Sequence, residues 1–258
     1  MAPDGWTRAV RQRLGLGRLL PLGEAADGAW LAEKAAAPVL RRAAEGIAGV
    51  GLGALRIGLA DPDTAAEPAV SPPPSALPPG PLRIEADFTA TAGGEPLPQR
   101  AERLRIALRE AASARLGLMV TAVDLRVTDL VEAGREPVAA APPDEGDDEE
   151  DEGGGGGAGH REGRGEAHGD GPPRPEEEAA SRAGAAAAAA PVPGVVRLTH
   201  TLGAPVHLAD GHVRVELAAA ADRRTLAVAL AVRKAVREAV TAVRGGRPTV
   251  AVLVTRVE

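Results

Sequence analysis

The chain has 258 residues, of which 44% are hydrophobic and only 1% aromatic, and its formal net charge is −6. The absence of cysteine excludes disulfide bonds, thiolate metal sites and cysteine nucleophiles. Residues 144–152 carry eight acids and the rest of the chain carries +2, which excludes the strongly basic footprint of a nucleic-acid-binding protein. Because Trp6, Trp30 and Phe88 are the only aromatic residues, any core must be built from Ala, Val, Leu and Ile.

Residues 1–25 are predicted to be a basic amphipathic segment. Trp6, Val10 and Leu14 share one helical face. Such a helix can lie on an anionic membrane surface. Because Gly15 and Gly17 limit it to about two or three turns, packing onto the first domain and an unstructured tail remain alternatives. The candidate contacts to a membrane or a partner are Trp6, Arg8, Arg11, Arg13 and Arg18.

The hydropathy of the chain gives no sign of a membrane span or a leader. No stretch reaches the roughly 20 apolar residues that a spanning helix needs. The leucines near the N-terminus are interrupted by glycine and by Arg18, unlike the apolar region of a signal peptide. We therefore expect a cytoplasmic location.

Residues 26–133 are predicted to form a first small α+β domain. A helix over 31–48 carries Pro38, which indicates either a kink or a helix start near position 37. A strand, a second helix that stops near Gly117 and a closing strand follow. The residues that carry this periodicity are Ala36, Leu40, Ala43 and Ile47; Leu82, Ile84, Ala86 and Phe88; Leu104, Leu108 and Ala112; and Val123, Leu125 and Val127.

Residues 61–81 interrupt this first domain, with seven prolines between Asp61 and Gly80. Proline-dense sequence favours extended polyproline II conformations, so the segment is predicted to be unstructured. It lies where the second half of the chain has only a short turn, and we interpret it as an expanded hairpin loop.

Residues 134–182 are predicted to be a disordered linker, because acidic and glycine-rich sequence cannot bury enough apolar surface to fold. Its acidic block either acts as a solvated spacer or recruits a basic partner. His160 and His168 lie among carboxylates there, but a flexible segment offers no preformed metal geometry. The glycines at 153–157 are not a phosphate-binding loop, since no Gly-Lys-Ser/Thr sequence follows.

Residues 183–258 repeat the pattern of the first domain. A weaker helical stretch ends in Gly194-Val195, as the earlier helix ends in Gly49-Val50. Asp210-Gly211 predicts a two-residue hairpin turn, in which Ala209 faces His212 and His207 faces Arg214. A strand, a helix over 225–243 and a closing strand follow; their periodic residues are Val213, Val215 and Leu217; Val228, Val232, Val236 and Val240; and Val250, Val252 and Val254. Matching order and spacing predict a duplicated module.

The fold class expected is therefore α+β: two tandem small domains, each a short antiparallel or mixed sheet with one or two packed helices, joined by the linker. No set of residues suggests acid–base, nucleophilic or metal chemistry, and an enzyme is not expected. His200, His207 and His212 are expected to be exposed hairpin residues. Arg233, Lys234 and Arg237 form a candidate interaction face on the helix over 225–243, or simply its solvated side.

The arrangement resembles the alkaline shock protein family of bacterial envelope-stress-response proteins. The resemblance rests on the helix and Gly-Val pair at Gly49-Val50 and Gly194-Val195, the strand after Asp210-Gly211, and the valine-rich helix and closing strand that follow. It covers roughly 185–258 best and 29–131 more loosely. The tandem arrangement, the proline-rich insertion and the polyalanine stretch before 191 depart from the family.

This resemblance implies a non-enzymatic cytoplasmic scaffold that self-associates and is recruited to the inner face of the membrane, often by a small membrane anchor. No cofactor, nucleic acid or small-molecule substrate is expected. The alternative hypothesis is a protein-binding module whose acidic linker recruits a basic partner.

Overall fold

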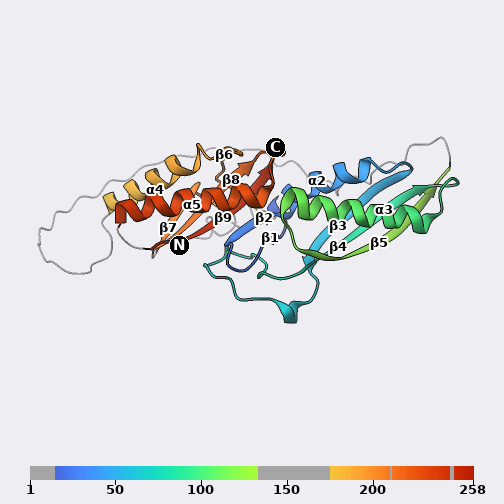
Figure 1. The fold of residues 1–258 in the computed structure, drawn as a ribbon, viewed down its shortest axis with the longest axis horizontal. Helices are drawn as coiled ribbons and strands as arrows, with labels where there is room; N and C mark the ends of the chain where they lie inside the picture. The colour runs from blue at the N-terminus through green and yellow to red at the C-terminus, as the bar shows by residue number, and fades with distance from the viewer. Residues whose placement is uncertain (1–14, 133–174, 210, 245–246) are drawn as a thin grey trace, which may run out of the picture.

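The computed structural model describes residues 15–132, 175–209, 211–244 and 247–258. Within these ranges the fold is α+β, with two mixed sheets and four α-helices (Figure 1). The helices are α2 (Glu33–Glu45), α3 (Leu97–Glu110), α4 (Pro175–Ala189) and α5 (Thr225–Arg244), with short η1 (Pro62–Thr64) and the π-helical turn η2 (Ala111–Leu116). The strands are β1 (Leu19–Leu22), β2 (Ala29–Ala32), β3 (Val50–Leu59), β4 (Leu82–Thr91), β5 (Val120–Val131), β6 (Val195–Leu198), β7 (Val206–Ala209), β8 (His212–Ala219) and β9 (Thr249–Val257).

Sheet B, as we call the three-stranded sheet, has the order β3-β4-β5. β3 is antiparallel to β4, and β5 is parallel to β4. β4 alternates strictly, because Leu82, Ile84 and Phe88 are buried while Arg83 and Glu85 are exposed. The sequence predicted this alternation, which follows from one covered face and one open face.

Sheet A, the larger sheet, has the order β1-β2-β9-β8-β6, with β7 also paired to β8. β6 and β7 are antiparallel to β8, and β8 is parallel to β9. The hairpin of β1 and β2 adds two strands beyond β9, with β2 parallel to it. β9 is therefore an interior strand, and Val250–Thr255 are buried on both of its faces.

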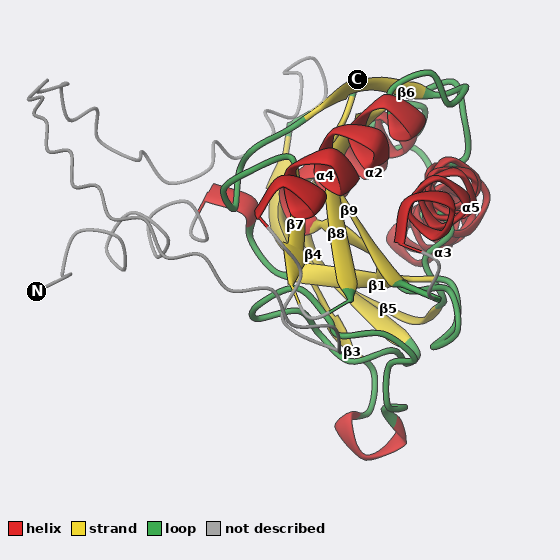
Figure 2. Ribbon diagram, turned by 90° about the vertical axis from the view of Figure 1, so that its left-hand side faces the viewer, coloured by secondary structure: helices red, strands yellow, loops and turns green. Residues whose placement is uncertain are grey.

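The two sheets share one connectivity. In each, a helix leads into a strand, β3 or β6, that pairs antiparallel with β4 or β8. A crossover helix then leads to a strand parallel to β4 or β8; in sheet A, β7 lies between β6 and β8 in sequence and also pairs with β8. Viewed along the long axis, α2 lies in line with α4 and α3 in line with α5, on the same side of the strands (Figure 2).

The buried positions of the two crossover helices also correspond. Counted from the first residue of α3 and of α5, four positions spaced four residues apart are buried in both, the last of them in η2 on the side of α3, whereas Thr225, Leu226 and Ala229 are buried only in α5. The pairs are Arg100 and Val228, Leu104 and Val232, Leu108 and Val236, and Ala112 and Val240.

The glycines of the two Gly-Val pairs share a backbone conformation that side chains rarely adopt. Gly49 has a φ of 72° and Gly194 a φ of 95°. Each follows a helix and opens the strand that leads back along the sheet, so glycine is required at the turn. Each also faces the crossover helix: a Cβ on Gly49 would meet Arg100, and one on Gly194 would meet Val228.

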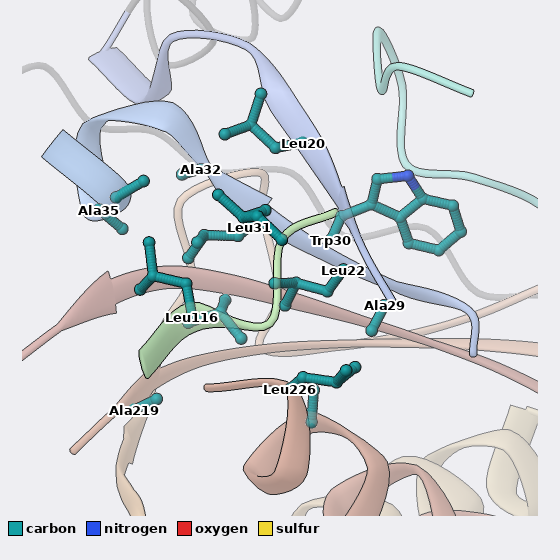
Figure 3. Close-up of a cluster of buried hydrophobic side chains, with 14 of the residues drawn as sticks. Leu20, Leu22, Ala29, Trp30, Leu31, Ala32, Ala35, Leu116, Ala219 and Leu226 are labelled. Atoms are coloured by element: carbon teal, nitrogen blue, oxygen red, sulfur yellow. The ribbon is translucent and has the colours of Figure 1, made fainter. Parts of the chain in front are cut away.

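A leucine-rich cluster joins the two halves. It lies where the β1–β2 hairpin, η2 and the start of α5 meet, and its side chains point toward one another (Figure 3). Gly23 donates its amide to the carbonyl of Gly117 at 3.1 Å, and a Cβ on Gly117 would overlap that of Leu226. The buried hydrophobic side chains of both halves form one cluster.

The N-terminal hairpin corrects part of the prediction for residues 1–25. Residues 1–14, with Trp6, Arg8, Arg11 and Arg13, lie outside the described residues. Beyond them, Leu19–Leu22 is not part of an amphipathic helix but the buried strand β1. The reason is local: Gly17 and Gly23 take positive φ on either side of it, and four consecutive buried residues suit a strand covered on both faces.

The proline-rich segment 61–81 is an expanded hairpin loop between β3 and β4, as predicted, but the expectation that it is unstructured is wrong. It folds back onto the β1–β2 hairpin. The Leu77 amide donates to the Leu19 carbonyl at 2.9 Å, and the Trp30 indole donates to the Leu77 carbonyl at 3.2 Å. Figure 3 shows this indole pointing away from the leucine cluster toward the loop. Val70 is buried in the same region, which supplies the apolar contact that local composition did not indicate.

Two boundaries also differ from the prediction. The first helix begins at Glu33 and contains Pro38, so a start near 37 is wrong. The proline removes one backbone donor, but burial of Ala36 and Leu40 holds the helix together. α4 begins at Pro175, inside the range 134–182 assigned to the linker, because Ser181, Ala185 and Ala189 bury a helical stripe against the rest of the fold. The remainder of that range, 134–174, lies outside the described residues.

Candidate interaction surface

Arg18 is the one predicted membrane-contact residue that the structure describes, and it is bound to the chain itself. Its amide donates to Glu33 Oε2 at 3.2 Å and its guanidinium donates to the Ile57 carbonyl at 3.1 Å. Glu33 Oε1 in turn accepts the Ile57 amide at 2.7 Å. Arg18 thus ties the N-terminal hairpin to the start of α2 and to β3.

The face predicted on α5 divides into two parts. Arg233 donates to the Val250 carbonyl at 3.0 Å and to the Ala26 carbonyl at 2.6 Å, which braces the turn between β1 and β2. Burial lowers the pKa of Arg233, and the neighbouring Arg237 adds to that shift, while Asp27 opposes it. Lys234 and Arg237 lie on the exposed side of the helix. Only these two of the three predicted residues are presented to solvent.

The hairpin histidines have the predicted register, since His207 pairs with Arg214 and Ala209 with His212. The alternation of the strands places His207, His212 and Arg214 on one face. Burial is the first cause that lowers the pKa of both histidines, and Arg214 is the second. His212 Nδ1 also lies 2.8 Å from Thr249 Oγ1. Both imidazoles are therefore held toward the neutral form. His160 and His168 lie outside the described residues.

Glu216 is a buried carboxylic acid that the sequence analysis did not single out. It lies on β8 beneath the connection between β6 and β7, and its side chain is fully buried. Its Oε2 accepts the Leu202 amide at 3.0 Å, and Arg214 Nη2 lies 3.5 Å from Oε1. Burial raises its pKa, against the amides of Leu202 and Thr201 and the charge of Arg214, which lower it. Glu216 continues the alternation of His212 and Arg214 along β8, so no local signal in the sequence indicates that it is buried.

The open face of sheet B carries alternating charges. Arg126 forms two hydrogen bonds to Asp87, at 2.8 and 2.9 Å, and Arg83 lies 3.4 Å from Asp124. The guanidinium of Arg126 lowers the pKa of Asp87, mainly through these hydrogen bonds. A shallow depression of about 410 Å³ crosses this face between Arg56, Glu85 and Arg126. The sequence predicted the alternation but not which charges pair.

A second depression, of about 330 Å³, lies where this face meets the proline-rich loop. Arg18, Arg56 and Arg83 line it together with Glu85. Three guanidinium groups around one hollow favour an anion, but Arg18 is already bound to the Ile57 carbonyl and Arg83 to Asp124. No described residue adds an unpartnered buried donor here. We therefore do not assign an anion site to this hollow.

The outer edge of sheet B is formed by β5, which pairs with β4 alone. It is 12 residues long, and most of its residues are exposed. Val127 is 42% exposed and Leu130 is 53% exposed. A long edge strand with exposed apolar side chains is a template for pairing with another strand. This edge is the feature of the described residues best suited to bind a protein.

Comparison with known proteins gives no relative: no family model, no curated protein and no solved structure matches the chain. In the part of the chain that the structure describes, no helix has the length and apolar character needed to cross a bilayer.

Proposed function

We propose that the protein is a non-enzymatic scaffold made of two tandem alkaline-shock-like units, which self-associates and is recruited peripherally to the cytoplasmic face of a bacterial membrane. The observation that carries the proposal is the pair of matching units, of which one is closed by the N-terminal hairpin and the other keeps an open edge strand.

The case for a duplicated unit is the coincidence of three independent features. These are the order of strand pairings, the buried positions of α3 and α5, and the positive φ at Gly49 and Gly194. The resemblance to the alkaline shock proteins rests on the Gly-Val pairs, the strand after Asp210-Gly211, and the valine-rich helix and closing strand that follow. The leucine cluster makes the two units one continuous core, which suits a scaffold better than a pair of flexibly tethered binders.

The case for association is the composition of β5. Soluble proteins generally shield a long edge strand, whereas this one exposes Val127 and Leu130 along its length. The two depressions on and beside the open face of sheet B are lined in part by charged side chains that bind one another. Association with protein therefore fits the described surface better than turnover of a small molecule.

Size-exclusion chromatography with light scattering tests self-association of the full chain. A defined oligomer is expected over a wide concentration range. A strict monomer at every concentration contradicts the scaffold proposal.

Recruitment is tested by fluorescent fusions in a bacterial cell. Deleting residues 1–22 also removes β1, so the sharper variant replaces Arg8, Arg11 and Arg13 by glutamine and keeps the hairpin. The matched control replaces Lys234 and Arg237 by glutamine and removes exposed positive charge elsewhere. We expect the first variant to leave the membrane and the control to stay. An unmodified protein that is diffuse throughout the cytoplasm contradicts recruitment.

A further inference from the structure

We infer that β5 pairs antiparallel with β5 of a second copy about a two-fold axis at Leu125, which joins two three-stranded sheets into one. This inference names the surface of the self-association proposed above and rests on it.

The first step is the contrast between the closing strands of the two units. β9 has β8 on one side and β2 on the other, whereas its counterpart β5 has only β4. Within the described residues nothing pairs with the outer side of β5. β9 pairs with β2 of the N-terminal hairpin, and no described strand takes the equivalent place beside β5.

The second step is the charge pattern of β5. In an antiparallel pair centred on Leu125, Asp124 of each copy faces Arg126 of the other. Arg83 contacts Asp124 and Asp87 binds Arg126, but Asp124 is still 60% exposed and Arg126 76% exposed, so both remain accessible to a second copy. Opposite charges directly across a pair of strands are stabilising, and like charges are destabilising. An isologous dimer repeats each such pair twice.

The third step is the apolar face. The pairing of β5 with β4 places Val120, Val123, Leu125, Val127 and Leu130 on the side of Leu82, Ile84, Ala86, Phe88 and Ala90, which faces the helices. In the same centred register Val127 faces Val123 of the second copy, and Leu130 faces Val120. Both exposed apolar residues of the strand are thereby covered.

The fourth step is regularity. The register between β4 and β5 shifts after Val120 and again after Val127, and the segment from Ala122 to Val127 between these shifts is regular. Regular backbone is what a new strand needs in order to form a ladder of hydrogen bonds. The two shifts also lie nearly symmetrically about Leu125. In the antiparallel pair the irregularity of one strand therefore lies opposite that of the other.

The test uses two single charge reversals in the full chain, Asp124→Arg and Arg126→Asp. Alone, each variant places like charges opposite each other twice, and we expect its dimer dissociation constant to rise about tenfold or more. Mixed together, the two variants place Arg opposite Asp and Asp opposite Arg, and we expect the mixture to recover association. Circular dichroism of each variant checks that the exposed substitution leaves the fold intact.

A second measurement uses the lack of cysteine in the chain. Leu125→Cys lies on the two-fold axis and should form an intermolecular disulfide under mild oxidation. Ser113→Cys, at an exposed position of η2, is the control for random collision and should not.

The outcomes separate this inference from the proposed function. If the unmodified chain is a monomer, both fail. If it is an oligomer that neither reversal weakens, and the Leu125→Cys variant does not crosslink, the copies meet elsewhere and this inference alone is overturned. Weakening by the single variants without recovery in the mixture also overturns it, because the loss then reflects the strand and not the facing charges.

Discussion

Sheet A and sheet B are built by the same order of elements, yet their closing strands lie in opposite surroundings. β9 is an interior strand with Val250–Thr255 buried, whereas β5 is an edge strand with only Val123 fully buried. The sequences reflect the difference: β9 is nearly continuous in apolar residues, and β5 alternates with Asp124, Arg126 and Asp129. A strand covered on both faces favours a continuous run of apolar residues. The pairing of the N-terminal hairpin with β9 therefore distinguishes the interior closing strand from the edge strand β5.

The faces opposite the helices differ in the same way. In sheet A the connection between β6 and β7 and the proline-rich loop cover this face, so that Glu216 and Trp30 are buried. In sheet B the corresponding face is open, and its charges pair in contact with solvent. The acid at Glu216 is thus buried beside Arg214, whereas the charged pairs of sheet B lie at the surface.

The largest expected effect comes from the hairpin that closes sheet A. Leu31 is fully buried on β2, and Leu31→Ala should lower the free energy of unfolding by about 3 kcal/mol through lost burial and a cavity. The matched truncation on the open edge, Val127→Ala, should change it by less than about 0.5 kcal/mol in the monomer. Urea unfolding at low protein concentration measures both. Equal effects would mean that the hairpin is not part of the core.

The two equivalent glycines provide a finer comparison. A Cβ on Gly194 would lie 2.6 Å from Val228 Cγ2, whereas one on Gly49 would lie 3.3 Å from Thr91 Oγ1. Both alanine variants carry the cost of a positive φ, about 1–2 kcal/mol, but only Gly194→Ala adds overpacking of about 1 kcal/mol or more. Gly93→Ala has a φ of 82° and no neighbour within 4 Å, and so measures the backbone cost alone. In urea unfolding, Gly194→Ala should lose the most free energy of unfolding, and Gly49→Ala and Gly93→Ala should lose less, by similar amounts.

The comparison of sheet A with sheet B also indicates which features the sequence could and could not predict. The alternation of β4 and the stripe of α5 follow local periods of two or four residues, the register of the hairpin at His212 follows from its two-residue turn, and each is confirmed. Local periodicity is the part of folding that a single chain segment determines.

The remainder depended on contacts distant in sequence. Pairing of β2 with β9 joins residues more than 200 positions apart, and the ordered proline-rich loop depends on Trp30 and Leu19. Buried Arg100 was not foreseen either: its guanidinium donates to the carbonyls of Gly93 and of Thr91, the latter at 2.6 Å. Val228 fills the equivalent position in the other unit, so no local rule requires a cation there.

The buried acid of sheet A gives a pH-dependent prediction. Burial raises the pKa of Glu216 above that of the unfolded chain, so the folded state keeps a proton that the unfolded state has released. Its stability contribution is therefore complete below the ordinary glutamate range and is lost as pH rises through the folded pKa. Glu216→Gln has no charge to bury. As pH rises from about 4 to about 8, the melting temperature of this variant should increase relative to that of the unmodified chain.

The control for this experiment is Glu85→Gln, on the exposed face of sheet B. It should follow the unmodified chain across the same pH range. The opposite result is that Glu216→Gln loses stability relative to that control as pH rises. That result would mean that Arg214 and the amides of Leu202 and Thr201 stabilise the charged carboxylate by more than burial destabilises it.

The smallest effect is expected from the ion pair of Asp87 and Arg126 on the open face. The hydrogen bonds from Arg126 lower the pKa of Asp87, so the pair contributes above the ordinary aspartate range and its contribution is lost as pH falls through the folded pKa. Arg126 is 76% exposed and Asp87 is 23% exposed, and an ion pair with such an exposed partner is weak and screened by salt. A double-mutant cycle of Asp87→Asn and Arg126→Gln in the monomer should give a small favourable coupling at neutral pH that disappears in acid, at about pH 2, and at high salt. A coupling that persists at high salt would mean that the open face is less solvated than its exposure indicates. The contrast between a covered sheet A and an open sheet B would then fail.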